Sequence, residues 1–172
     1  AGVITAVSDD VEEWKVGDRV CALLPGGGYA EQVVVPAGML LRLPDEWSFA
    51  QGAAVPEVWL TAYVNLFLEG DLQAGETVLI HAGASGVGTA AIQLAKAYET
   101  TVIITASAGK HQVCLDLGAD LAIDYQNQDF QQEVLEYTQG KGVNVIIDFI
   151  AAPYFHQNIN SLAIDGRLVL LA

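Results

Sequence analysis

The chain has 172 residues, of which 52% are hydrophobic, and its seven Lys and Arg residues against 21 Asp and Glu residues give a net charge of -14. This length and apolar content allow a sizeable core, so we expect one complete domain with part of another. The acidic balance without a basic cluster argues against nucleic acid and anionic membranes as partners. No apolar stretch reaches the roughly 18 to 20 residues that span a bilayer, and we find no secretion signal, so we expect a soluble, cytoplasmic protein.

Residues 1 to about 45 carry short β-like runs separated by Gly, Pro and Asp, which predict part of a small β-barrel. The runs are GVITAV (2–7), VGDRVCALL (16–24) and YAEQVVVP (29–36). Residues 48–70 are apolar at helical spacing, are interrupted at Pro56 and end at Gly70, so we expect two helices near a domain boundary. We place the partial barrel domain at residues 1–52.

From Gly75 onward, apolar strand-like runs alternate with helix-like runs, in a pattern of five strands and four helices. Apolar strands joined by helical crossovers predict a doubly wound α/β fold, with a parallel sheet covered on both faces. We assign residues 53–172 to this Rossmann-type domain. The chain begins without Met inside one apolar run and stops inside another, RLVLLA (167–172), so we interpret it as an internal piece of a longer protein.

The stretch HAGASGVG (81–88) follows the first of these strands directly and opens the first helix. This is the place of a dinucleotide-binding turn, whose G-x-G-x-x-G frame falls on Gly83, Ser85 and Gly88. Gly83 permits a tight turn, Gly88 allows close packing of the helix, and the amides around Ser85, Gly86 and Val87 can face a diphosphate. Serine replaces the usual middle glycine, but its small hydroxyl can donate a hydrogen bond to a phosphate or a ribose. The alternative is a turn that needs glycine only for its conformation.

The second strand ends in TASAGKH (105–111), at the position where NAD-specific folds carry an acidic residue for the adenosine ribose. No acid is present. Ser107 and Lys110 instead supply a hydroxyl and a cation, with His111 as a further donor, and this chemistry suits the 2′-phosphate of NADPH. The alternative is that Ser107 caps the next helix and Lys110 is a solvated charge.

Metal and proton-transfer sites are not indicated. Cys21 and Cys114 lie far apart and are interpreted as buried reduced thiols, and the three histidines lack the spacing of zinc ligands. Asp148 ends the fourth strand of this domain, where an aspartate more often caps the following loop than acts as a base. We therefore assign no catalytic proton-transfer residue.

Several stretches together carry a family resemblance: VGDRVCALLPGGGYAEQ, AAVPEVWLTAY, VLIHAGASGVGTAAIQLAK, TASAGK, LGAD, IDYQNQDF and DGRLVLL. In this order they resemble the zinc-independent quinone oxidoreductases of the medium-chain dehydrogenase/reductase superfamily. LLPGGG, PEVWLTA and HAGASGVGTAAIQL are most similar to the p53-inducible quinone oxidoreductase subgroup. The resemblance covers essentially the whole chain. It implies a GroES-like barrel domain before a Rossmann domain, usually in a homodimer, and NADPH-dependent reduction of a quinone.

The resemblance also implies roles for single residues. Ser85, Gly86 and Val87 would meet the diphosphate and the nicotinamide side, while Ser107, Lys110 and Tyr125 would hold the 2′-phosphate end. Two further positions are implied near the nicotinamide, Thr61 for the ring and Ile150 for its ribose. The alternative for Thr61 is an ordinary helix residue with no role in binding. The alternative for Tyr125 is an aromatic residue at a strand end that packs on a helix.

The chain departs from the family pattern in two ways. Ala151 and Ala152 stand where family members usually have paired glycines after the fourth Rossmann strand, and they could crowd the backbone near the nicotinamide. The family's first barrel strands, an active-site tyrosine and asparagine, and the sheet-edge strand used for dimerisation all lie outside this sequence. The chain therefore holds most of a cofactor site but only part of a substrate site.

Three functions remain open from the sequence. The first is an NADPH:quinone reductase, in which hydride transfer needs positioning and electrostatics but no metal. The second is a related medium-chain reductase of enones or enoyl thioesters. The third is a cofactor-binding module or inactive isoform. A methyltransferase is disfavoured because the acid that would hold the ribose of S-adenosylmethionine is missing.

Overall fold

The computed structural model describes residues 1–171, which form two compact units, residues 1–60 and 61–171. The first unit holds a three-stranded antiparallel sheet in the order β1-β2-β3. Its strands are β1 (Gly2–Val3), β2 (Arg19–Cys21) and β3 (Leu41–Arg42), with the short 3-10 helix η1 (Ala37–Met39) between the last two. All three strands are short, and the core of this unit is small.

Helix α1 (Phe49–Ala53) starts at a capping box that the sequence encodes locally. The Ser48 side chain accepts a hydrogen bond from the Gln51 amide, and the Gln51 side chain accepts one from the Ser48 amide. Two amides that the helix itself cannot satisfy are thereby paired. Gly52 faces Leu43, where a Cβ would lie 2.4 Å from a Leu43 methyl group.

The expectation of a strand over residues 29–36 is wrong, because this segment has no regular secondary structure. Val34 is fully exposed and Val33 is half exposed. An isolated β-like sequence is stabilised only when a neighbouring strand pairs with it. Within residues 1–171, no strand pairs with this segment.

The two helices predicted around Pro56 are present. Pro56 opens helix α2 (Pro56–Tyr63), where its missing amide costs nothing. A single π-helical segment, η2 (Val64–Glu69), continues directly from α2 and is capped by Gly70. A Cβ at Gly70 would lie 2.8 Å from the Asn65 carbonyl oxygen, so glycine is needed at this end.

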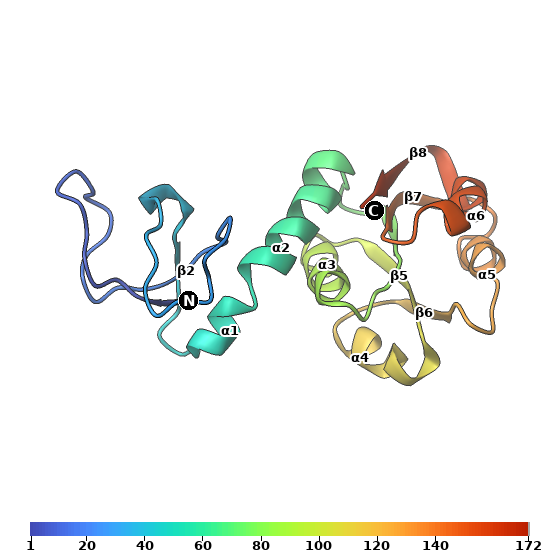
Figure 1. Ribbon diagram of the computed structural model, residues 1–172. Helices are drawn as coiled ribbons and strands as arrows, with labels where there is room; N and C mark the ends of the chain where they lie inside the picture. The colour runs from blue at the N-terminus through green and yellow to red at the C-terminus, as the bar shows by residue number, and fades with distance from the viewer. Residues whose placement is uncertain (172) are drawn as a thin grey trace. The chain divides into compact units, whose positions relative to one another are not determined.

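The second unit is built on a five-stranded parallel sheet in the order β6-β5-β4-β7-β8. This confirms the doubly wound α/β prediction (Figure 1). Its strands are β4 (Thr77–Ile80), β5 (Thr101–Ala106), β6 (Leu121–Asp124), β7 (Val143–Asp148) and β8 (Leu162–Leu170). The helices between them are α3 (Gly86–Ala97), α4 (His111–Asp116), α5 (Phe130–Tyr137) and α6 (Phe155–Ser161), with the 3-10 turns η3 (Ala108–Lys110) and η4 (Ala152–Tyr154).

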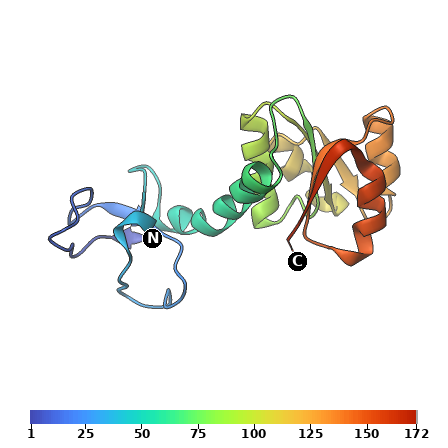
Figure 2. The same ribbon diagram turned by 90° about the horizontal axis from the view of Figure 1, so that it is seen from above.

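Helices cover both faces of this sheet. Figure 2 shows the orange and red helices α5 and α6 on the face opposite the green helix α3. On the α5 face, Phe130 and Val134 pack against alternate residues of the buried strands. The strand residues in this core are Leu79, Ile103, Ile123, Val143 and Ile146, all fully buried. Central parallel strands are buried on both faces, which explains why the sequence shows continuous apolar runs there.

An arginine clamp ties β8 to the turn before β4. The Arg167 guanidinium donates to both carboxylate oxygens of Glu76, at 2.8 Å and 2.7 Å, and to the Gly70 carbonyl oxygen at 2.8 Å. The hydrogen bonds from Arg167 hold the pKa of Glu76 below its usual range. This bidentate geometry is the strongest form of an ion pair, and it fixes one side of the second unit.

No helix in residues 1–171 is both long and apolar enough to cross a membrane.

Candidate functional site

The carboxyl ends of the parallel strands share one edge of the sheet, and the predicted phosphate turn lies there. Ser85 is the N-cap of α3, and its hydroxyl oxygen accepts a hydrogen bond from the Gly88 amide at 3.0 Å. This explains serine at the middle position of the turn, since a glycine could not cap the helix with a side chain. Because the Ser85 oxygen acts as the acceptor in this bond, its proton stays available for a ligand.

The two framing glycines leave no room for a side chain. A Cβ at Gly83 would lie 2.6 Å from the Ile104 Cβ on β5, and a Cβ at Gly88 would lie 2.5 Å from the Ala82 carbonyl oxygen. The left-handed residue of the turn is Ala82, with φ 49°, and not Gly83. Gly83 is therefore required by close packing against β5, whereas the sequence suggested that it was needed for the bend itself.

Two backbone amides of this turn are available to a ligand. The Gly86 and Val87 amides have no hydrogen-bond acceptor among residues 1–171. Ser85 and Gly86 are exposed. Unpaired amides at the start of a long helix also carry the positive end of the helix dipole, so this turn can hold an anionic diphosphate.

Ser107 and Lys110 lie just beyond β5, beside the turn in the sheet order. The Gly83 amide donates to the Thr105 carbonyl oxygen at 2.9 Å, which joins the phosphate turn to the end of β5. Ser107 occupies the N-cap position of η3, but its side chain makes no capping hydrogen bond, so the alternative role as a helix cap is not supported.

Lys110 is exposed and is one of the three lysines and arginines that form no ion pair in residues 1–171. Four of the seven Lys and Arg residues form ion pairs in residues 1–171: Arg19, Arg42, Lys96 and Arg167. Lys110 has no such carboxylate partner in that part of the chain. His111, by contrast, is held by a 3.0 Å contact between its Nε2 atom and the Ala106 carbonyl oxygen. This leaves only the Nδ1 atom of His111 for a ligand.

The remaining predicted residues lie on neighbouring elements. Tyr125 follows β6 and Ile150 follows β7, so both are at the same sheet edge as the turn, and both side chains are about half exposed. Thr61 is half buried on α2, and its carbonyl oxygen accepts a hydrogen bond from the Asn65 side chain at 2.8 Å. The structure therefore brings the phosphate turn, Ser107, Lys110, Tyr125 and Ile150 to one edge.

A buried polar network below this edge was missed by the sequence reasoning. The His81 ring contacts the Thr105 hydroxyl at 2.9 Å through Nδ1 and the Asn158 side-chain oxygen at 2.8 Å through Nε2. Asn158 donates in turn to Asp148 at 2.9 Å. The available signal was that His81, Thr105 and Asp148 are polar residues at or just past the ends of apolar strands. Asn158 gave no signal at all.

Asp148 caps the loop after β7, as predicted. Its carboxylate accepts hydrogen bonds from the Ile150 amide at 2.7 Å and the Ala151 amide at 3.2 Å. The side chain is fully buried, so it has no access to a substrate proton. This supports leaving Asp148 out of any acid–base role.

Ala151 adopts a conformation that suits glycine, with φ 63° and ψ -119°. This conformation is strained for a residue with a Cβ, by roughly 1 to 3 kcal/mol. We expect Ala151→Gly to raise the free energy of unfolding by about 1 kcal/mol after the entropy of the unfolded glycine is subtracted. The melting temperature should rise by about 3 °C. Ala152→Gly is the matched control, and thermal unfolding should show it slightly destabilised; equal effects of the two variants would contradict the strain.

Burial also predicts how stability depends on pH. Burial lowers the pKa of His81, although Asn158 and Asp148 oppose the shift. The unfolded chain therefore binds a proton at higher pH than the folded chain does. The contribution of His81 to stability should be constant above about pH 7.5 and fall as the pH drops below the unfolded value of about 6.5, by at most ~1.4 kcal/mol per pH unit. Urea unfolding at pH 5 to 8 should show this slope in the wild type and a flatter one in His81→Gln.

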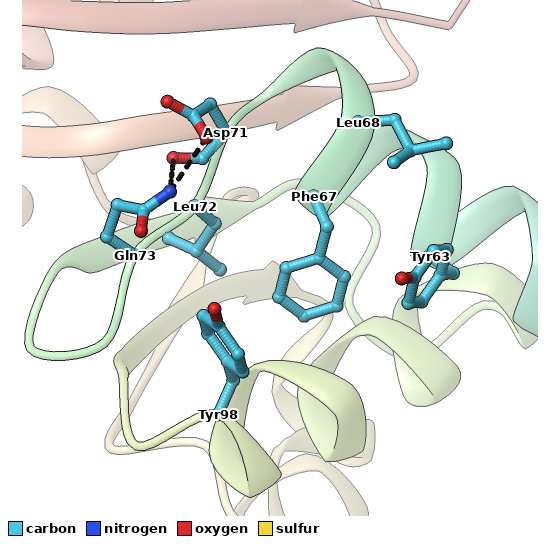
Figure 3. Close-up of a pocket in the computed structure, with 7 residues that line it drawn as sticks. All are labelled: Tyr63, Phe67, Leu68, Asp71, Leu72, Gln73 and Tyr98. Carbon is cyan, nitrogen blue, oxygen red and sulfur yellow. Dashed lines mark hydrogen bonds between the residues drawn. The ribbon is translucent and has the colours of Figure 1, made fainter.

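A separate hollow of about 300 Å³ lies away from this edge (Figure 3). Figure 3 shows Phe67 between Tyr98 and Tyr63, and the rings of Phe67 and Tyr98 meet edge to face with their centroids 4.9 Å apart. Tyr98 is the C-cap of α3, whereas the phosphate turn is at the N-terminus of that helix. A helix of twelve residues is about 18 Å long, so this hollow is not part of the predicted cofactor site.

Two family models match the chain. Residues 86–172 match the model described as zinc-binding dehydrogenase, and residues 1–45 match the alcohol dehydrogenase GroES-like domain. The chain belongs to the medium-chain dehydrogenase/reductase superfamily. The GroES-like part and the Rossmann sheet are thus both established, and the matches confirm the superfamily that the quoted stretches resemble.

Similar solved structures include reductases of two kinds. CurK enoyl reductase has 34% identity and a TM-score of 0.92, with coverage of 98% of this chain and 51% of that one. The quinone oxidoreductase of Pseudomonas syringae pv. tomato has 38% identity and a TM-score of 0.89, over 99% and 53%. A mycobacterial protein solved in complex with NADPH has 35% identity and a TM-score of 0.88, over 99% and 54%.

Curated relatives are longer than this chain. The phenolphthiocerol synthesis polyketide synthase Pks15/1 of Mycobacterium bovis is 39% identical over 171 residues, which are 98% of this chain and 8% of that protein. The human synaptic vesicle membrane protein VAT-1 homolog is 38% identical over 170 residues, which are 98% of this chain and 43% of that protein. The chain spans about half the length of the matching solved structures, and less of these relatives.

The zinc implied by one family description has no fitting ligand set among residues 1–171. In residues 1–171, no three His, Cys, Asp or Glu side chains gather as metal ligands would. Cys21 and Cys114 are buried in different units, and both ring nitrogens of His81 are already hydrogen-bonded. We derive no chemical step through a metal.

Proposed function

We propose that the chain carries the cofactor site of an NADPH-dependent quinone reductase, similar to the p53-inducible subgroup. The quinone acceptor in this proposal rests on the family resemblance, and the choice of NADPH is supported most directly by an observation at the carboxyl end of β5. There, the Ser107 side chain makes no capping hydrogen bond and Lys110 has no ion-pair partner within residues 1–171, and both follow the strand where NAD-binding folds place an acid. A cation and a hydroxyl suit a 2′-phosphate, whereas an acid would repel it.

Each part of the site has a proposed task. The Gly86 and Val87 amides and the Ser85 hydroxyl bind the diphosphate, and Gly83 and Gly88 let the backbone approach it. Ser107, Lys110 and Tyr125 hold the 2′-phosphate end, and Thr61 and Ile150 lie toward the nicotinamide. The cofactor, when bound, supplies a hydride. The protein orients it, and a reduced quinone can take its protons from water, so no buried acid is required.

A related enoyl reductase is the second candidate, because enoyl reductase structures are among the most similar ones. Neither the phosphate turn nor Lys110 separates quinones from enoyl thioesters, since both bind the cofactor rather than the acceptor. The assay that separates the two functions follows NADPH consumption at 340 nm with a panel of quinones and with enoyl thioesters. Turnover of quinones alone supports the proposed quinone reductase. Turnover of enoyl thioesters alone supports the enoyl reductase instead.

Calorimetric titrations with NADPH and NADH test the cofactor site itself. We expect NADPH to bind at least roughly tenfold more tightly, a difference of about 1.4 kcal/mol. Tighter binding of NADH would overturn the proposed roles of Ser107 and Lys110. Binding of neither, by a folded chain, would mean that the turn at Ser85 needs glycine only for its conformation, or that cofactor binding requires residues outside this sequence. The proposal also includes a homodimeric state and a cytoplasmic location. Analytical ultracentrifugation tests the homodimer.

A further inference from the structure

The polar network under the cofactor edge is fully buried and fully paired. The side chains of His81, Asn158 and Asp148 are 0% exposed and that of Thr105 is 1% exposed. In residues 1–171, no buried side-chain nitrogen or oxygen lacks a hydrogen-bond partner. A buried network of this kind is costly unless every member is satisfied, and a satisfied one specifies a single arrangement. Packing alone does not explain why four polar side chains are buried together at this place.

The hydrogen bonds of this network run in one direction. Asp148 only accepts, so the Asn158 amide nitrogen faces it and the Asn158 oxygen faces His81. The His81 Nε2 atom must therefore carry the proton, and its Nδ1 atom accepts from the Thr105 hydroxyl. Every donor and acceptor in the series is fixed by the one before it.

The network joins the two loops that flank the proposed cofactor. At one end, His81 immediately precedes the phosphate turn, and its amide donates to the Ile147 carbonyl oxygen at 3.0 Å. At the other end, Asp148 accepts hydrogen bonds from the Ile150 and Ala151 amides. These two bonds hold Ala151 in its strained conformation, with φ 63°. Strain of this kind persists only where surrounding contacts enforce it.

We propose that Thr105, His81, Asn158 and Asp148 form a positioning network that fixes the Ile150–Ala151 loop against the nicotinamide half of the cofactor. These residues act through the loop and do not touch the reacting atoms. The inference rests on the proposed function, because it takes the carboxyl edge of the sheet as the cofactor site. It predicts that damage to the network weakens contacts to the nicotinamide half and spares those to the adenosine half.

The test exchanges the charge between two positions. In Asn158→Asp, two carboxylates face each other, and the donor to Asp148 is lost. Adding Asp148→Asn restores the pattern, because the new amide at position 148 donates to the new carboxylate at position 158. That carboxylate still accepts from His81 Nε2, and the amide oxygen at position 148 still accepts from the Ile150 and Ala151 amides. The double variant thus keeps the network and its net charge.

Two probes separate the halves of the cofactor: NADPH, and adenosine 2′,5′-bisphosphate, which lacks the nicotinamide half. We expect Asn158→Asp to weaken the binding of NADPH about tenfold and the binding of the bisphosphate by less than about twofold. In the double variant, the affinity for NADPH should return to within about threefold of wild type. Equal loss of both ligands, or no recovery in the double variant, would overturn the proposal. Thr105→Val, which replaces the hydroxyl with a methyl group of similar size, should show the same selectivity at about threefold if Asn158→Asp does not fold.

Amide hydrogen exchange gives a readout that needs no ligand. The Ile150 and Ala151 amides should exchange faster in the single variant and recover in the double variant. The Asp120 amide, bonded to the Val102 carbonyl oxygen at 2.8 Å on the opposite sheet edge, should not change. Unchanged exchange at Ile150 and Ala151 would overturn the positioning role. A wild type that binds neither probe would instead refute the proposed function, and the exchange data would still decide the network's effect on the loop.

Discussion

Gly88→Ala is expected to lower the free energy of unfolding by about 3 kcal/mol and to weaken NADPH binding by more than roughly tenfold. The added Cβ would lie 2.5 Å from the Ala82 carbonyl oxygen and 2.6 Å from that of Gly83. Both obstacles are backbone atoms, which cannot move aside as a side chain can. The turn must therefore open, and the Gly86 and Val87 amides then lose their alignment. Urea unfolding and calorimetry measure the two effects.

Gly109→Ala is the matched control for stability in the same unit. A Cβ at Gly109 would meet nothing within 4 Å, so its free energy of unfolding should stay within about 0.5 kcal/mol of wild type. If Gly88→Ala behaved like this control and also kept its affinity for NADPH, the close contact between α3 and the turn would not be required.

Lys110→Ala is expected to weaken NADPH binding by roughly ten- to a hundredfold and to leave NADH binding within about twofold. A hydrogen bond to a charged group contributes roughly 1.5 to 3 kcal/mol, and only NADPH carries the 2′-phosphate. NADPH should thus lose its advantage over NADH. Parallel calorimetric titrations of both cofactors measure the ratio.

Lys141→Ala removes the same charge from the other end of the sheet. Lys141 precedes β7 and has no ion-pair partner in residues 1–171, so it matches Lys110 in everything except position. At about 0.15 M salt, a charge acts over roughly 8 Å, so this variant should bind NADPH as the wild type does. Equal losses in the two variants would show that net charge, and not a contact with the 2′-phosphate, sets the affinity.

The α/β unit could be predicted because its signals are local. Continuous apolar runs such as TVLI and VNVIID lie in buried parallel strands, and HAGASGVG stands directly between a strand and a helix. The first unit was harder to predict, because residues 29–36 have β-like composition and yet form no strand. Whether such a segment pairs depends on a neighbour that its own composition does not encode.

The site could be predicted only where its residues follow the ends of strands. Ser85, Ser107 and Lys110 are of this kind, and the structure brings them to one edge. The buried network is different, because His81 and Asn158 are 77 positions apart and their pairing is created by the packing of α6 under the sheet. Backbone strain was also predicted only in part. Ala82 has φ 49°, although the sequence suggested Gly83 for the tight turn, and Ala151 has φ 63° at a position where family members usually have glycine.

The strand order has a consequence for how the protein is made. The turn at the end of β4 is flanked on one side by β5, which follows it closely, and on the other by β7, which is synthesised only after α4, β6 and α5. Pairings between distant segments form late in folding because a long loop must close first. A nascent chain could therefore complete the β4–α3–β5 half of the unit before Ile147 is available to accept the hydrogen bond from the His81 amide. Until β7 pairs with β4, the phosphate turn lacks the loop after β7 on one of its two sides. The growing chain therefore does not yet have a complete dinucleotide site.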